Sequence, residues 1–228
     1  MDILVVLEDN HGSLHRMSRE AIAGAQQLGE SITALAIGQH ASLLADKLSG
    51  VDLAEVLTVS HELVSSYNAD GYAEVVRQII EAESPQLIIA GHTYQTRDYM
   101  PRVSAKCDIP FIPDVISAED GSYVKLVLNS KLNATVSASS DTVILSFQSA
   151  AYSDEDLVPG SCASRPFEVN LDTAMVRSET EEPFQEDAGD VDLESAELII
   201  SIGRGIEKEE NIPMVFDLAN ALGAEISA

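Results

Sequence analysis

The chain has 228 residues and a mass of 24.4 kDa, and 45% of its residues are hydrophobic, so it is not disordered and can fill one domain and part of another. Its 38 acidic and 13 basic residues give a formal net charge of −25, which argues against binding nucleic acid or an anionic membrane surface. The apolar runs are far shorter than the ~20 residues of a membrane span, so we expect no direct membrane insertion. No targeting segment is visible, and two cysteines, Cys107 and Cys162, fit a reduced cytoplasm.

The first ninety residues alternate between strand and helix patterns. Continuous apolar runs indicate strands covered on both faces, and apolar residues three and four apart indicate amphipathic helices. Strand and helix alternating at this spacing predict βαβ units, and therefore a parallel sheet with right-handed crossovers. The strand patterns cover residues 3–7, 32–37, 56–59 and 87–90, and the helix patterns cover 14–28, 42–48 and 69–82.

The pattern changes after residue 90. Residues 91–98 are predicted to form a polar loop, and a helix carrying Tyr99, Val103 and Cys107 follows, with Pro101 in its first turn. After Asp114, short turns separate three strand patterns with no helix between them, which predicts antiparallel strands appended to the parallel sheet. These strand patterns are 124–128, 132–138 and 143–147.

An acidic segment divides the chain. Residues 152–194 hold 13 acidic and 2 basic side chains, which indicates a solvated linker or surface strap. Beyond it come a strand pattern, a glycine-rich turn, an amphipathic helix capped by Gly223, and the start of another strand. We therefore expect a core domain at 1–152, an acidic linker at 153–194, and at 195–228 the first β-α unit of an incomplete second α/β domain.

The chain contains no motif for nucleophilic catalysis or phosphate binding. No hydrolase elbow, P-loop or dinucleotide fingerprint is present, and Glu8 and Asp9 follow the first strand where a phosphate would need bare backbone N–H groups. His11 and His15 have a metal-like spacing but no apparent third ligand, and Cys107 has no adjacent base. We expect no catalytic residue and no metal site.

Gly203, Arg204 and Gly205 form the one turn with a chemical rationale. The glycines would let the backbone approach a ligand closely, and the arginine would offer a cation and planar donors to an electron-rich ring or a phosphate. An ordinary strand-to-helix turn with an exposed arginine explains the same residues, and the spacing leaves both interpretations open.

Four segments in this order carry a resemblance to a known family. The first is the opening strand at 3–8 with the helix that ends in Gln26-Gln27-Leu28-Gly29, and the second is the stretch 87–103, which ends in Pro101-Arg102-Val103. The third is Pro113-Asp114-Val115. The fourth is Ser201-Ile202-Gly203-Arg204-Gly205-Ile206, which Asn211 and residues 217–224 follow. Together they resemble the alpha subunit of the electron-transfer flavoproteins along nearly the whole chain. Ile202 stands where the family pattern has a glycine.

The resemblance implies a heterodimeric electron carrier, not an enzyme with its own turnover. The first domain would be Rossmann-like, bind no cofactor and pack against a beta subunit of related fold. The second domain would hold FAD, accept electrons from acyl-CoA or related dehydrogenases and pass them to a quinone oxidoreductase. Arg204 matches a family arginine that contacts FAD, and Gly203 and Gly205 flank it. The later flavin contacts of the family would follow Ala228, so we expect the 228-residue chain to bind little or no FAD.

Two other functions remain open on the residues alone. The strand–helix alternation also fits a nucleotide-binding module for AMP or ATP, of the stress-protein-like type. It fits equally an assembly protein whose sheet serves only to dock a partner. Calorimetry with nucleotides distinguishes the first of these from a flavoprotein scaffold, and co-expression with a beta subunit addresses the second.

Overall fold

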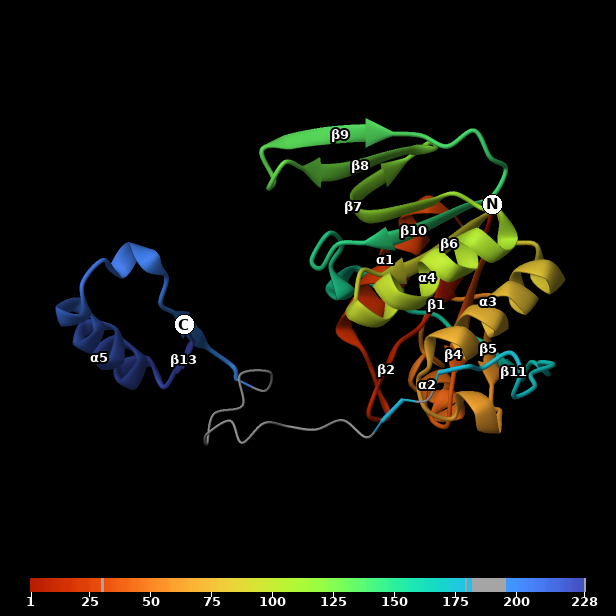
Figure 1. Ribbon diagram of the computed structural model, residues 1–228, viewed down its shortest axis with the longest axis horizontal. Coiled ribbons are helices and arrows are strands. Elements are labelled where there is room, and N and C mark those ends of the chain that lie inside the picture. Colours follow the sequence, from red (N-terminus) through yellow and green to blue (C-terminus); the bar gives the residue numbers. More distant parts are fainter. Residues whose placement is uncertain (30, 179, 182–195, 228) are drawn as a thin grey trace. The chain divides into compact units, whose positions relative to one another are not determined.

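The structure is a computed structural model that describes residues 1–29, 31–178, 180–181 and 196–227. The chain divides into two compact units, residues 1–180 and residues 181–228, which we call the first and the second unit and describe separately (Figure 1).

The first unit is built on a nine-stranded sheet in the order β11-β5-β4-β1-β6-β10-β7-β8-β9. Neighbouring strands from β11 to β7 run parallel, whereas β7, β8 and β9 pair antiparallel. The mostly parallel α/β fold with appended antiparallel strands is thus confirmed. The strands are β1 (Asp2–Val6), β4 (Ser31–Ile37), β5 (Glu55–Val59), β6 (Leu87–Gly91), β7 (Phe111–Glu119), β8 (Ser122–Val127), β9 (Leu132–Val136), β10 (Val143–Phe147) and β11 (Ala163–Pro166).

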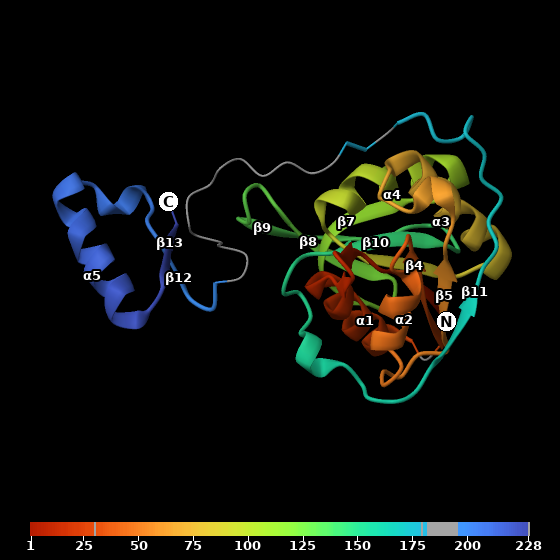
Figure 2. The ribbon, with the colours of Figure 1, turned by 90° about the horizontal axis from the view of Figure 1, so that it is seen from below.

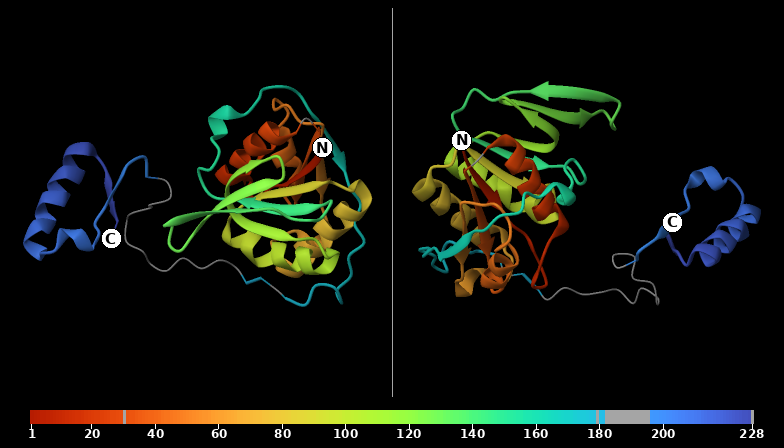
Figure 3. Two further views of the ribbon diagram at one scale, coloured as in Figure 1. Left: turned by 90° about the horizontal axis from the view of Figure 1, so that it is seen from above. Right: turned by 180° about the vertical axis from the view of Figure 1, so that it is seen from behind.

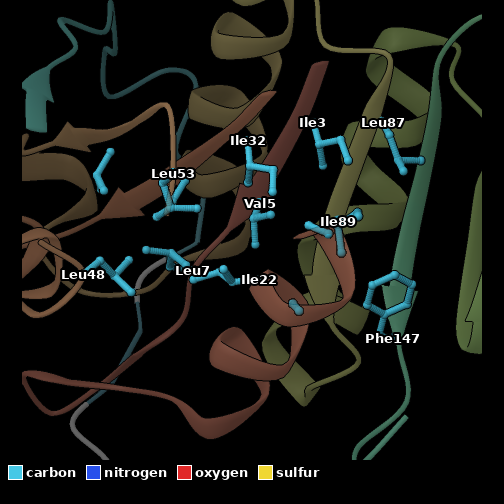
Figure 4. Close-up of a cluster of buried hydrophobic side chains, with 14 of the residues drawn as sticks. Ile3, Val5, Leu7, Ile22, Ile32, Leu48, Leu53, Leu87, Ile89 and Phe147 are labelled. Carbon is cyan, nitrogen blue, oxygen red and sulfur yellow. The ribbon is translucent and has the colours of Figure 1, made fainter. Parts of the chain in front are cut away.

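Helices cover both faces of this sheet (Figures 2 and 3). The helices α1 (Arg16–Leu28) and α2 (Ala41–Lys47) cover one face, and α3 (Ala69–Glu83) and α4 (Tyr94–Cys107) cover the other. Side chains of a strand alternate between faces, so β1 contributes to both cores. Ile3 and Val5 pack with Ile22 and Phe147 on the α1 side, as Figure 4 shows, whereas Leu4 packs on the α3 side.

The strand β10 differs from its prediction. We expected 143–147 among the antiparallel strands, but β10 lies parallel between β6 and β7, and all five of its residues are buried. A fully buried position suits the unbroken apolar run Val143-Ile144-Leu145, which does not by itself specify a strand direction. The prediction of an antiparallel β10 is therefore wrong, and the antiparallel pairs of the nine-stranded sheet are β7 with β8 and β8 with β9.

The strand β7 and the start of α4 were also missed. Pro113 and Asp114 lie in β7 where the register of this strand with β10 shifts, and Asp114 has φ +62°. The strand therefore carries a bulge at two residues whose types usually end a strand.

The expected loop 91–98 is mostly the first turn of α4, which begins at Tyr94 because the Thr93 hydroxyl accepts a hydrogen bond from the Thr96 N–H. Pro101 consequently lies inside the helix rather than in its first turn.

Two short hydrogen-bonded strands precede α1. β2 (Asp9–Asn10) and β3 (Ser13–Leu14) form a small hairpin, and α1 begins only at Arg16, with His15 as its N-cap. The helix therefore starts two residues later than the apolar pattern suggested.

The described part of the acidic segment 153–194 packs on the first unit. Its strand β11 pairs with β5, and the Arg165 guanidinium binds the Glu55 carboxylate at 2.8 Å and the Glu83 carboxylate at 2.9 Å. Further on, the Asp70 carboxylate accepts a hydrogen bond from the Arg177 backbone N–H at 3.1 Å. Residues 179 and 182–194 of the predicted linker lie outside the described residues, and the domain boundaries at 152 and 194 stay a prediction.

The described part of the second unit is one β-α-β element. The strands β12 (Ile199–Ser201) and β13 (Glu225–Ser227) pair in parallel, and η3 (Arg204–Ile206), η4 (Glu209–Asn211) and α5 (Ile212–Leu222) connect them. Gly223 ends α5 at φ +65°, as the sequence predicts. Ala219 alone is buried in α5, and four large apolar side chains of that helix are at least half exposed, namely Met214, Phe216, Leu218 and Leu222.

Candidate functional site

The carboxyl ends of β12 and β13 bring two hydroxyl groups together in the second unit. Ser201 and Ser227 are the last paired residues of the two strands, and their Oγ atoms lie 2.6 Å apart. The Ile202 N–H donates to the Ser227 carbonyl at 2.7 Å, so the chain leaves β12 still held against β13. In open parallel sheets ligands bind outside the carboxyl ends of the strands, which makes this edge the candidate site.

The glycine-rich turn begins at this edge. Gly203 precedes η3, and its carbonyl accepts a hydrogen bond from the Ile206 N–H at 3.1 Å. Neither Gly203 nor Gly205 has a positive φ, and a Cβ atom added to either would meet nothing within 4 Å. The backbone of the described residues therefore does not require glycine at either position, and the open space fits both the approach of a ligand and an ordinary exposed turn.

The Arg204 side chain is exposed between the two glycines. Among the described residues it takes part in no hydrogen bond or ion pair, although most arginines of the first unit bind carboxylates. Its planar donors remain available for an electron-rich ring or a phosphate. One cation, two open glycines and a hydroxyl pair at a sheet edge are groups that fit a flavin nucleotide.

The equivalent edge of the first unit is already filled. β1 is the point where the strand order reverses, and Glu8 follows it while Thr93 follows β6. The Thr93 hydroxyl donates to the Glu8 carboxylate, and the Glu8 N–H donates to Ser18 Oγ at 2.8 Å. Burial raises the pKa of Glu8, and the hydrogen bond from Thr93 offsets this only in part. A carboxylate that closes this crevice disfavours a phosphate there, and so disfavours the nucleotide-binding alternative.

The surroundings of His11, His15 and Cys107 give these side chains no place in a metal site or a catalytic site among the described residues. His15 caps α1 by accepting the Met17 N–H at Nδ1, at 3.1 Å, while His11 is exposed in the β2–β3 turn. Burial raises the pKa of the Cys107 thiol, which makes it a poorer nucleophile. No group of three or more metal-ligating side chains occurs in the ranges that the structure describes.

Comparison with known proteins identifies the family. A family model described as "Electron transfer flavoprotein domain" matches residues 3–169, and one described as "Electron transfer flavoprotein FAD-binding domain" matches residues 192–228. The chain belongs to the electron transfer flavoprotein family. The second match begins before β12 and includes Ser201, the turn Gly203–Gly205 and Ser227, so the stretch that forms the candidate site lies within the FAD-binding domain of the family.

Similar proteins include alpha subunits of this family. The chain is 29% identical to "Electron transfer flavoprotein subunit alpha" of Bacillus subtilis, over 99% of this chain and 71% of the relative. It is 26% identical to the subunit of the same name from Methylophilus methylotrophus, over 98% and 72%, and 24% identical to "Protein FixB" of Clostridium saccharobutylicum, over 99% and 70%. The resemblance to the alpha subunit of this family is confirmed, and with it an electron-transfer function that uses FAD.

Sequence reasoning placed Gly203, Arg204 and Gly205 but missed the serine pair. The structure brings these residues to one edge of the β12–β13 pair, although contact with FAD stays a prediction for all three. The signal for the pair was a serine at the end of each of two strand patterns. Only the parallel register of those strands makes the two serines neighbours.

Proposed function

We propose that the carboxyl edge of β12 and β13 contributes part of the FAD site of the heterodimer, with Gly203, Arg204 and Gly205 in contact with the flavin nucleotide. Among the described residues the Arg204 guanidinium has no hydrogen-bond or ion-pair partner, and it lies between two glycines with open space, at the edge where the Ser201 and Ser227 hydroxyls meet. This observation carries the proposal. FAD, when bound, supplies reversible uptake of electrons. A positive charge at Arg204 favours the electron-rich state of the bound group.

The two units divide the work. Alpha subunits of this family pair with a beta subunit, and we propose that the first unit docks that subunit while the second unit contributes to the flavin site. The closed edge at Glu8 and Thr93 supports a first unit that binds no nucleotide of its own. Acyl-CoA or related dehydrogenases would donate electrons to the heterodimer, and a quinone oxidoreductase would accept them.

The chain would act as a carrier rather than as an enzyme with its own substrate. The described residues contain no helix of the length and apolarity that crossing a membrane requires. Two free cysteines, Cys107 and Cys162, support our proposal of a reducing cytoplasm.

Co-expression with the beta subunit tests the proposal. We expect the two chains to co-purify as a one-to-one complex, measured by size-exclusion chromatography with light scattering. A chain that stays alone at micromolar concentrations of both proteins would contradict the heterodimer, whatever its flavin content.

A further inference from the structure

Three of the six tyrosines of the chain form one cluster in the first unit, which we call the tyrosine cluster. It consists of Tyr67, which precedes α3, Tyr72 in α3 and Tyr99 in α4. The ring centroids of Tyr67 and Tyr72 lie 4.9 Å apart, those of Tyr72 and Tyr99 lie 5.9 Å apart, and the rings meet edge to face. Tyr72 and Tyr99 are buried, whereas Tyr67 is partly exposed. The rings are close enough for an electron to pass from the buried pair to Tyr67.

Tyr67 differs from the other tyrosines in the partner of its hydroxyl group. It donates to the Asp98 carboxylate at 2.8 Å, with the Gln95 carbonyl a more distant acceptor at 3.4 Å. The Tyr72 hydroxyl donates to the Ile37 backbone carbonyl at 3.2 Å. All six tyrosines lie in the described ranges, and within these ranges no other tyrosine hydroxyl donates to a carboxylate. A carboxylate can take up a proton, whereas a backbone carbonyl cannot, so Tyr67 has a base beside its hydroxyl.

Asp98 can become neutral without leaving a cation unpaired. The Arg102 guanidinium lies 3.3 Å from the Asp98 carboxylate and 3.0 Å from the Asp70 carboxylate, and Asp70 is the more buried of the two acids. If Asp98 takes up a proton, Arg102 keeps its shorter ion pair with Asp70. Protonation of Asp98 therefore costs less free energy than protonation of a carboxylate that is the sole partner of an arginine.

The Tyr67 hydroxyl keeps its proton at neutral pH. Burial, and then the hydrogen bond to Asp98, raise the pKa of this phenol. A phenol that loses an electron becomes a strong acid, so the electron and the proton leave together. The proton acceptor must be in place when the electron leaves, and Asp98 Oδ2 already lies 2.8 Å from the hydroxyl. Oxidation of Tyr67 consequently requires no release of a proton into water.

We propose that Tyr67 is a one-electron donor to strong oxidants, such as organic radicals and high-valent metal complexes, with Asp98 as its proton acceptor. One electron passes from the Tyr67 ring to the oxidant, and the phenolic proton moves to Asp98 Oδ2. The products are a neutral tyrosyl radical, a neutral Asp98 carboxyl group and an oxidant reduced by one electron. An electron from a thiol or an enediol reductant then restores the phenol, and the proton returns from Asp98.

The tyrosine cluster would collect oxidising equivalents that reach the core of the first unit. In the described part of the chain Tyr72 and Tyr99 have no carboxylate partner, so a radical formed on either is passed to Tyr67, where the proton has an acceptor. Because Tyr67 is partly exposed, a small reductant can reach it. Every group of this site lies in the first unit, so the inference holds wherever FAD binds.

Photo-oxidation of the full chain tests the site. Tris(bipyridine)ruthenium(II) and persulfate generate the oxidant under light, and the tyrosyl radical is measured by electron paramagnetic resonance in rapidly frozen samples. We expect the signal of the unaltered chain to fall several-fold in Tyr67→Phe. The matched control is Tyr94→Phe, because Tyr94 is 87% exposed and has no carboxylate partner among the described residues. A signal that falls no further in Tyr67→Phe than in Tyr94→Phe would overturn the proposal, because exposure alone would then decide which ring is oxidised.

Two further variants test the role of Asp98. Asp98→Asn keeps the size of the side chain but cannot take up the proton, so the signal should fall although the Tyr67 ring is retained. Arg102→Gln also removes the ion pair between Asp98 and Arg102 but leaves the carboxylate, so the signal should persist. Oxidation of the unaltered chain should be slower in heavy water, and this effect should be smaller in Asp98→Asn. Equal signals in Asp98→Asn and the unaltered chain, or equal losses in the two variants, would show that Asp98 is not the proton acceptor.

Mapping of the radical in the unaltered chain keeps the test decisive if a variant fails to fold. The radical is captured with a nitroso spin trap, and the adduct is located by mass spectrometry. An adduct on Tyr67 is the expected result. An adduct mainly on Tyr94 or on another ring outside the tyrosine cluster would contradict the proposal.

Discussion

Thr93 and Glu8 join the carboxyl ends of the two central strands β6 and β1 by a hydrogen bond from hydroxyl to carboxylate. This bond lies at the point where the strand order reverses, which is the position where related α/β sheets accept a nucleotide. The first unit therefore retains the sheet of a nucleotide-binding protein, but its own acidic side chain occupies the entrance.

Glu8→Gln should stabilise the first unit at neutral pH. Burial raises the pKa of Glu8, so its ionisation destabilises the folded state. This loss of stability is absent below pH 4.5, the usual pKa of the carboxyl group. It grows as the pH rises from there to the raised pKa of the folded state, and it is complete above that pKa. The melting temperature of the variant should exceed that of the unaltered chain increasingly as the pH rises from 4.5 to neutral. Equal melting curves at every pH would contradict a buried, ionised Glu8.

The first unit should not bind ATP or AMP. A phosphate at the switch point would meet the Glu8 carboxylate rather than bare N–H groups. Calorimetry with each nucleotide should show no heat of binding at micromolar concentrations of protein. Micromolar affinity for either nucleotide would contradict this prediction. If the Thr93→Val variant, which lacks the hydroxyl, then lost that affinity, the nucleotide would bind at this edge of the sheet.

Asp70→Ala should expose the chain at Arg177 to trypsin. Asp70 holds the Arg177 backbone N–H at 3.1 Å and the Arg102 guanidinium at 3.0 Å, so its loss frees the segment that ends the first unit. Cleavage after Arg177 should become several times faster, measured by mass spectrometry of timed digests. Asp98→Ala is the matched control, because Asp98 also binds Arg102 but not Arg177. Equal rates for the two variants would show that Asp70 does not anchor the segment.

Gly91→Ala should destabilise the first unit by about 1–3 kcal/mol. A Cβ atom at Gly91 would lie 2.6 Å from the Met17 Cβ atom and 3.1 Å from the Met17 carbonyl oxygen, so α1 would have to move away from β6. Gly50→Ala is the control, because an added Cβ atom there meets nothing within 4 Å. Chemical denaturation should show a lower free energy of unfolding for Gly91→Ala and no change for Gly50→Ala. An equal change in the two variants would mean that α1 moves away from β6 without loss of stability.

Arg204→Gln should weaken binding of free FAD. We expect the purified 228-residue chain to retain little flavin in its visible spectrum, so the affinity is measured by fluorescence titration with added FAD. Loss of the guanidinium should lower the affinity about tenfold, the equivalent of one charge-assisted hydrogen bond. Arg204→Lys should fall between, because lysine keeps the charge but not the planar fork. Lys208→Gln, four residues away, should bind like the unaltered chain, and an equal loss there would indicate a nonspecific charge effect.

The sequence predicted the alternating core of the first unit because each strand and helix there has a clear apolar period. It failed at β7 and β10 for opposite reasons. Pro113 and Asp114 made β7 resemble a turn, although a bulge accommodates them, while the apolar run of β10 was recognised but its direction was not. Strand direction depends on which neighbours enclose the strand, and those neighbours lie far away in the chain.

The candidate site was predictable only in part. Arg204 and its glycines are adjacent in sequence, so their pattern could be read directly. Ser201 and Ser227 are separated by the whole of α5 and meet only through the register of β12 and β13. The Glu8–Thr93 bond, between residues 85 positions apart, needs the sheet order itself.

The place of β10 between β6 and β7 sets the order in which the newly made chain can fold. As residues leave the ribosome, β6 emerges long before the strand that must lie beside it, because residues 92–142 have to be made first. Until then one side of β6 has no neighbour, and its buried residues Ile88 and Ile89 stay open to unwanted pairing. The sheet of the first unit should therefore be completed late in synthesis, when β10 inserts between β6 and β7. A chaperone that binds the nascent chain would have most time to bind the exposed side of β6.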